Sequence, residues 1–244
     1  MNKNNVVRIL EEFASPDTQE NWDNSGWQVK LANEDVENVM VCVSVTDDVL
    51  NQAIEKKANL IVSHHPMIFP NIKTVEDPVI CKAVQNGIQI YSMHTSFDKA
   101  GIGTSGFLAN ELGFYNLERI DDYVQIADLE QEIAIDNLII KIKLALNIEK
   151  VKLLSYDTAK MIKRVAFVAG SGGSFIEKLN DFNIDLFVTS DIKYHDEMKP
   201  RNYIIIDVGH LESERPALKK IVNLLNDTGM GIFTANEKSQ KIYL

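Results

Sequence analysis

Residues 60–66 of the chain read Leu-Ile-Val-Ser-His-His-Pro. Three apolar residues in a row are typical of a strand that is buried on both faces, as in a parallel sheet. The proline lacks a backbone N–H and stops the strand, so two adjacent histidines follow the strand end directly. Because ligands of open α/β sheets bind beyond the carboxyl ends of the strands, this segment indicates both a parallel sheet and a site at its edge.

Three further apolar runs end in polar side chains. One ends at His94 and another at His210, and each histidine is followed four residues later by a carboxylate, Asp98 or Glu214. The run at residues 39–45 is followed by Thr-Asp-Asp, of which Asp47 or Asp48 is expected to cap the next helix. Four of the five histidines therefore stand at expected strand ends, where scattered surface histidines would rarely line up.

Strand and helix patterns alternate along the chain, which predicts an α/β fold with two lobes, mostly parallel sheets and flanking helices. Strands are expected at residues 39–45, 60–63, 88–93, 151–155, 164–169, 186–189 and 203–207, with edge strands at 232–233 and 242–244. Helices are expected at residues 5–13, 47–57, 78–85, 104–113, 136–146, 174–181 and 212–227, the last one interrupted near its start by Pro216. The alternation restarts after about residue 125. We therefore expect residues 1–125 with 204–244 to form a metal-binding lobe and residues 126–203 to form a second lobe over the cleft.

The 244-residue chain is acidic, with a net charge of -10. This charge disfavours binding to DNA or RNA, unless a basic patch lies inside a ring cavity. No apolar stretch approaches the roughly 20 residues of a membrane helix, and the N-terminus lacks the apolar region of a signal peptide. Cys42 and Cys81 lie in apolar segments without a Cys-x-x-Cys motif, as expected of buried thiols in a reducing cytoplasm.

The side chains at the strand ends are nitrogen and oxygen donors without a thiolate, which suits Zn, Fe, Mn or Co. One Zn takes three or four ligands. Five or six ligands, with one carboxylate able to bridge, indicate two ions about 3.5–4 Å apart. Any one of these histidines taken alone is also compatible with a polar cap or a hydrogen-bonded core residue.

The sequence resembles the Nif-three-like proteins, which are often called homologues of GTP cyclohydrolase I type two. The resemblance extends over nearly the whole chain, and its motifs occur in the same order and spacing. The motifs are Trp22-Asp-Asn-Ser-Gly-Trp-Gln-Val29, Ser63-His-His-Pro66, His94-Thr-Ser-Phe-Asp98, Gly170-Ser-Gly-Gly-Ser174, Thr189-Ser-Asp-Ile-Lys-Tyr-His-Asp196 and Gly209-His-Leu-Glu-Ser-Glu214. One departure is Ser190, where the family usually has glycine before the aspartate.

The resemblance implies a two-lobed α/β protein with a dinuclear metal centre, commonly assembled as a toroidal hexamer. It implies that Glu214 bridges the two ions, and that His94 stands beside the site as a weak ligand or as a neighbour of the ligands. The full set of metal ligands that it implies is His64, His65, Asp98, His210 and Glu214.

Two further polar loops each leave two interpretations. The turn at residues 170–174 offers N–H groups to an anion, or it is a tight turn that begins a helix. His195 is a general acid or base, or a surface residue that caps a helix. Trp22, Asn24 and Trp27 are expected to anchor the N-terminal segment by packing, with direct contact to a substrate as the less favoured alternative.

The main functional hypothesis is a metal-dependent hydrolase of a nucleotide-like or phosphorylated small molecule, in which His94 or His195 moves protons. The family label suggests a cyclohydrolase that acts on GTP. The same ligands suit the hydrolysis of amides, amidines and phosphoesters equally well. The alternative is a non-catalytic, metal-stabilised ring that serves as a scaffold or regulator.

Overall fold

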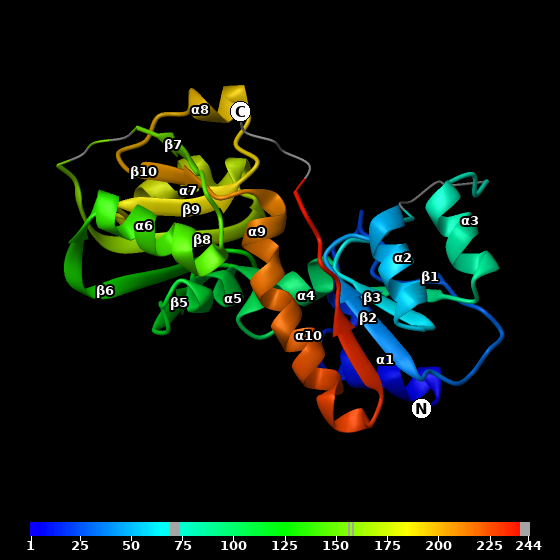
Figure 1. Cartoon of the computed structure of the whole chain (residues 1–244). Coiled ribbons are helices and arrows are strands. Elements are labelled where there is room, and N and C mark those ends of the chain that lie inside the picture. The colour runs from blue at the N-terminus through cyan, green and yellow to red at the C-terminus, as the bar shows by residue number, and fades with distance from the viewer. Residues whose placement is uncertain (69–73, 156, 158, 240–244) are drawn as a thin grey trace. The chain divides into compact units, whose positions relative to one another are not determined.

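Two units, each built around its own β-sheet, make up the chain in this computed structural model, which describes residues 1–68, 74–155, 157 and 159–239 (Figure 1). Unit 1 comprises Met1–Gly101 with Leu218–Leu244, and unit 2 comprises Ile102–Ala217. The expected lobe boundaries at residues 125 and 204 differ from this division, which places His210 and Glu214 in unit 2 rather than with the N-terminal residues. The expected edge strand at 242–244 lies outside the described residues.

The sheet of unit 1 has the strand order β1-β4-β3-β2-β11. Strands β4, β3, β2 and β11 run parallel to their neighbours, and β1 pairs antiparallel with β4. Cys42 lies opposite Ser63, and Ser63 lies opposite Ser92, so three carboxyl ends are level with one another. The strands are β1 (Gly26–Val29), β2 (Asn38–Cys42), β3 (Leu60–Ser63), β4 (Gln89–Ser92) and β11 (Gly231–Thr234).

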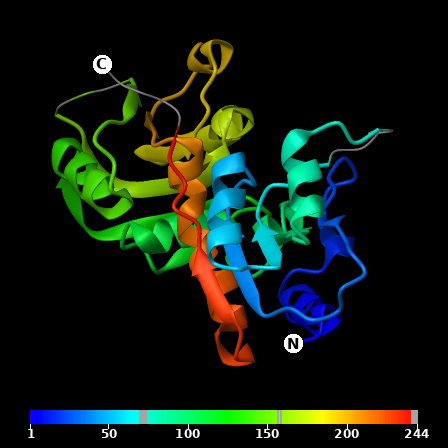
Figure 2. The same ribbon diagram turned by 45° about the vertical axis from the view of Figure 1, so that its right-hand side comes forward.

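Every residue of β3 and β4 is buried, so both faces of these central strands are covered, as the continuous apolar run of β3 indicates. Met40, Ile61 and Ile90 share a buried cluster with residues of α2 and α3, and these two helices lie on the same side of the sheet (Figure 2). Each fully buried aliphatic side chain contributes about 1.5–3 kcal/mol. The helices of unit 1 are α1 (Lys3–Phe13), α2 (Asp47–Glu55), α3 (Pro78–Gln85), α4 (Thr95–Lys99) and α10 (Leu218–Leu225), with 3-10 turns at Pro16–Thr18 and Asn226–Thr228.

The sheet of unit 2 is mixed and has the order β5-β6-β8-β9-β10-β7. The pairs β8–β9 and β9–β10 are parallel, whereas β5–β6, β6–β8 and β7–β10 are antiparallel. The predicted α/β class is thus confirmed, with the parallel arrangement prevailing in unit 1. The strands are β5 (Leu117–Arg119), β6 (Gln125–Ala134), β7 (Lys152–Leu154), β8 (Met161–Ser171), β9 (Leu186–Ser190) and β10 (Ile204–Asp207).

Apolar clusters cover the two faces of the second sheet. Residues of α5 and α6 share one cluster with Phe167 and Val188, and residues of α7 share the other with Phe187. The helices of unit 2 are α5 (Gly103–Glu111), α6 (Ile135–Leu146), α7 (Ile176–Leu179), α8 (Tyr194–Glu197) and α9 (His210–Glu214), with 3-10 turns at Gly173–Phe175, Asn180–Phe182 and Arg215–Ala217. Within the described part of the chain, no helix is long and apolar enough to cross a bilayer.

Several local predictions need correction. The helix expected at 212–227 already begins at His210, and its expected interruption at Pro216 is confirmed by the 3-10 turn that separates α9 from α10. Helix α2 is capped by Thr46, whose hydroxyl accepts from the N–H of Val49, rather than by Asp47 or Asp48. Strand β6 was not predicted, since most of its C-terminal half is exposed or half-buried.

Candidate metal centre

Three histidines gather at the carboxyl ends of β3 and β4 in unit 1. His64 and His65 follow β3, and His94 precedes the first turn of α4. One ring nitrogen from each lies within 4.8 Å of the others, so they form a group that could hold a metal ion. The level strand ends of the parallel sheet produce this meeting of residues that are 30 positions apart.

The ring of His64 is held in one tautomer. Its Nδ1 lies 2.8 Å from the carbonyl oxygen of Met93, and because a carbonyl only accepts, Nδ1 must donate. The lone pair is then on Nε2, which lies 3.7 Å from Asp98 Oδ1. A histidine that binds a metal through one nitrogen commonly donates the other N–H to such an acceptor. Both His64 and Asp98 therefore suit the predicted ligand role.

His65 is held by the hydroxyl of Ser44, and the backbone of that residue is in turn held by a carboxylate distant in sequence. Its Nδ1 is hydrogen-bonded to Ser44 Oγ at 2.7 Å. The carboxylate of Glu237 accepts from the backbone N–H groups of Val43 and Ser44 at 2.7 and 2.8 Å. The segment after β11 thus fixes the loop that holds His65.

His94 is held by a buried carboxylate. Its Nδ1 lies 2.7 Å from Asp23 Oδ1, and Asp23 also accepts from the N–H and hydroxyl of Thr95 at 3.0 and 2.6 Å. Burial raises the pKa of Asp23, but these hydrogen bonds and the charge of His94 outweigh it and hold the pKa well below the usual range. The ionised carboxylate fixes the ring and leaves Nε2 of His94 to bind a metal or exchange a proton.

In unit 2, one histidine lies between two carboxylates. His210 Nδ1 is 2.6 Å from Asp191 Oδ2, and His210 Nε2 is 3.0 Å from Glu214 Oε1. The hydrogen bond to Glu214 and the charges of both carboxylates outweigh burial and raise the pKa of His210 to about 9. The spacing of four residues on α9 places His210 and Glu214 on one face of the helix.

Gly170 gives Glu214 the room that it occupies. A Cβ at Gly170 would lie 2.6 Å from Glu214 Oε1, and Gly170 has a φ of +69°. The next glycines of this turn serve packing, because a Cβ at Gly172 would lie 2.0 Å from Thr189 Oγ1. The carbonyl of Gly173 accepts from Lys199 Nζ at 2.7 Å. These contacts support the tight-turn interpretation of the loop.

The donor set fits a divalent metal of borderline hardness. Four imidazoles and two carboxylates supply nitrogen and oxygen, which suit Zn, Fe, Mn or Co. In each of the four rings, Nδ1 is engaged by a protein group and Nε2 is the second nitrogen. Unit 1 offers three imidazoles and Asp98, whereas unit 2 offers one imidazole and Glu214. The role of these residues as ligands remains a prediction.

The structure also shows residues that the sequence reasoning missed or misplaced. Asp23 and Asp191 hold ring nitrogens, although both already belonged to the quoted motifs. His195 lies in α8 with its ring edge-on to Tyr194 at 5.6 Å, and its proposed acid–base role remains a prediction. Trp22 was expected to be packed, but 57% of its surface is accessible and its ring meets only the edge of the His94 ring among the described ring contacts.

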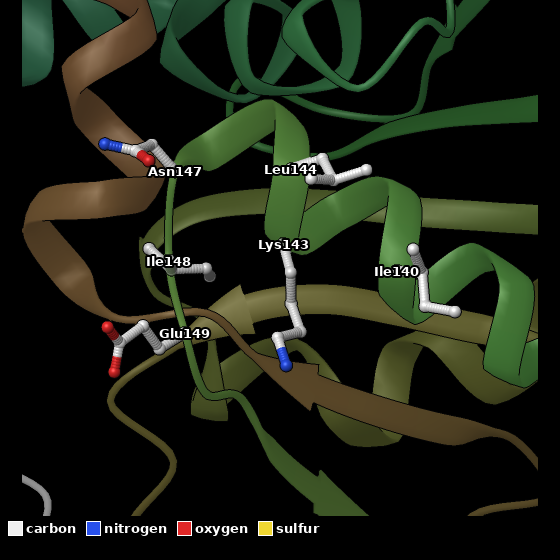
Figure 3. Close-up of a pocket in the computed structure, with 6 residues that line it drawn as sticks. All are labelled: Ile140, Lys143, Leu144, Asn147, Ile148 and Glu149. Carbon is white, nitrogen blue, oxygen red and sulfur yellow. The ribbon is translucent and has the colours of Figure 1, made fainter.

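A separate pocket of about 500 Å³ lies beside the C-terminal end of α6 (Figure 3). Its lining holds one cation and one carboxylate but neither histidine nor cysteine, so it lacks the ligands of a borderline metal. The lining residues are Ile140, Lys143, Leu144, Asn147, Ile148 and Glu149.

The sequence profile of the family Duf34/NIF3 (NGG1p interacting factor 3) matches residues 1–240. The chain belongs to this family. The predicted resemblance is thereby confirmed. A protein of Helicobacter pylori named GTP cyclohydrolase 1 type 2 is 32% identical, with 96% of each chain covered. A Nostoc protein named GTP cyclohydrolase 1 type 2 homolog is also 32% identical, covering 92% of this chain and 91% of its own.

Solved structures show the same fold. The Staphylococcus aureus hypothetical protein SA1388 has a TM-score of 0.90 at 24% identity and covers 100% of this chain and 99% of its own. Reduced HcgD from Methanocaldococcus jannaschii has a TM-score of 0.83 at 18% identity, with 97% and 98% covered. At these identities the likeness concerns the fold alone.

Proposed function

We propose that this member of the Duf34/NIF3 family binds two divalent metal ions and hydrolyses a nucleotide-like or phosphorylated small molecule. The observation that carries the proposal is the orientation of the histidines. Nδ1 of each ring is engaged by a carbonyl, a hydroxyl or a carboxylate. Rings fixed in this way present Nε2 without losing side-chain freedom on binding. The names of the Helicobacter pylori and Nostoc relatives support cyclohydrolase chemistry.

When bound, two such ions lower the pKa of water and polarise a carbon or phosphorus centre. The residues of the chain hold the ions and place the proton-transfer groups. Asp23 keeps the Nδ1 proton of His94 in place, so that Nε2 is available as a ligand or as a proton carrier. His195 is the second proposed proton carrier.

Metal content of the freshly purified protein, combined with hydrolysis assays on GTP, other nucleotides and phosphoesters, tests the proposal. We expect close to two ions per chain and turnover that is lost in Glu214→Ala. Glu212→Ala is the matched control, because Glu212 lies on the same helix but outside the candidate ligands. Two ions without turnover of any of these compounds would favour a non-catalytic metal-stabilised scaffold instead. Absence of bound metal after reconstitution would contradict the proposal.

A homohexamer is part of the same proposal. It is supported by family membership, and light scattering of the metal-loaded protein measures it directly. A monomeric mass would contradict it without affecting the metal site.

A further inference from the structure

The two tryptophans of unit 1 have different environments. Trp27 lies in β1, where its ring meets Tyr91 edge-on at 5.4 Å and Lys30 Nζ lies 5.5 Å from its ring centre. Trp22 is 57% exposed. Leaving an indole in water forgoes the free energy that burial of a large aromatic ring provides. The exposed ring therefore calls for an explanation that packing does not give.

The backbone that carries Trp22 is firmly held. The N–H of Asp23 donates to the carbonyl of Glu20 at 3.0 Å, and the N–H of Glu20 donates to Thr95 Oγ1 at 2.9 Å. The buried Asp23 carboxylate binds His94 and Thr95. The exposed ring thus projects from a loop with little freedom, as a preorganised binding surface should.

The ring of Trp22 also lies beside the histidine group. Its centre is 5.9 Å from the centre of the His94 ring, with an interplanar angle of 76°. The same hydrogen bonds to Asp23 fix the position of His94 and of the residue next to Trp22. A planar molecule on the indole face would therefore lie next to a side chain of the candidate metal centre.

We propose that Trp22 is a stacking platform for the planar heterocyclic ring of the substrate. Stacking of a nucleobase on an aromatic side chain contributes about 1–3 kcal/mol and accepts any base, because every base has a π-face. Trp22 thus selects for a flat heteroaromatic ring, and the histidines act on its polar atoms. This inference rests on the proposed function for the nature of the substrate, but binding tests it without turnover.

Tryptophan fluorescence separates the two rings. In Trp27→Phe, Trp22 is the only indole, and we expect guanosine and adenosine nucleotides to quench its emission, whereas ribose 5-phosphate does not. In Trp22→Phe, the emission of Trp27 should stay unchanged when the same nucleotides are added. The dissociation constant for a nucleotide should rise about 5- to 150-fold in Trp22→Ala and less in Trp22→Phe, which keeps a ring. Metal content should remain that of the wild type.

Three results would overturn the platform. The first is nucleotide affinity that is equal in Trp22→Ala and wild type. The second is wild-type protein that binds none of these nucleotides. The third is Trp22 emission that shifts to shorter wavelength on self-association alone, which would make the ring a contact between copies. Each leaves the metal proposal intact as long as two ions per chain are measured, so the two failures are distinguishable.

Discussion

The histidine group of unit 1 and the His210 pair of unit 2 are held in different ways. Unit 1 gathers three imidazoles, of which His64 is fixed by a backbone carbonyl, His65 by a hydroxyl and His94 by the single carboxylate of Asp23. Unit 2 places His210 between Asp191 and Glu214. Two carboxylates stabilise an imidazolium, whereas a carbonyl and a hydroxyl only orient a ring. In unit 2, a metal would therefore have to displace the proton that His210 holds between its carboxylates. In unit 1, the Met93 carbonyl leaves the lone pair of His64 on Nε2.

Gly170→Ala should have the largest effect, because it crowds the candidate ligand Glu214 and strains the backbone at the same position. The added Cβ would lie 2.6 Å from Glu214 Oε1 at a φ of +69°. We expect the metal content to fall and the free energy of unfolding to drop by about 1–3 kcal/mol from backbone strain. Elemental analysis and chemical denaturation measure the two effects.

Gly113→Ala is the control for this change. Gly113 has a φ of +88°, but nothing lies within 4 Å of a Cβ built there. It should share the loss of stability without the loss of metal. Equal metal content in the two variants would contradict a ligand role for Glu214.

The carboxylates that hold Nδ1 allow a matched comparison between the units. Asp191→Asn and Asp23→Asn should each weaken metal binding about 10- to 100-fold, as measured by competition with a chelator. Asparagine tolerates the left-handed φ of 53° at position 191. Asp23→Asn should also destabilise unit 1 by about 1–3 kcal/mol, because Thr95 loses a charged acceptor. Equal loss of stability in the two variants would contradict the difference between the units.

The smallest effect concerns the pH dependence of the metal-free protein. The folded-state pKa of His210, about 9, lies above the ordinary value of 6.5. The protonated ring therefore stabilises the folded state fully below about pH 6.5, and this contribution is lost as the pH rises through about 9. His210→Gln should remove this part of the slope in chelator-treated samples denatured with urea. An unchanged slope would show that another group titrates there.

Local patterns predicted the strands that carry the candidate ligands, since a buried parallel strand and the residues just past it are adjacent in sequence. Partners from distant segments could not be predicted in this way. Asp23 meets His94 across 71 positions, and nothing near either residue specifies the other. The exposure of Trp22 was missed for a related reason, because an aromatic residue in a polar turn has the same local pattern whether it packs or not.

Unit 1 is discontinuous, and this has a consequence for biosynthesis. Strand β11 and Glu237 follow all of unit 2 in the chain, yet β11 pairs with β2 and Glu237 holds the loop of Ser44. On the ribosome, the whole of unit 2 emerges before the sheet of unit 1 can be completed. We therefore expect the group around His65 to reach its final geometry only after the whole of unit 2 has been synthesised.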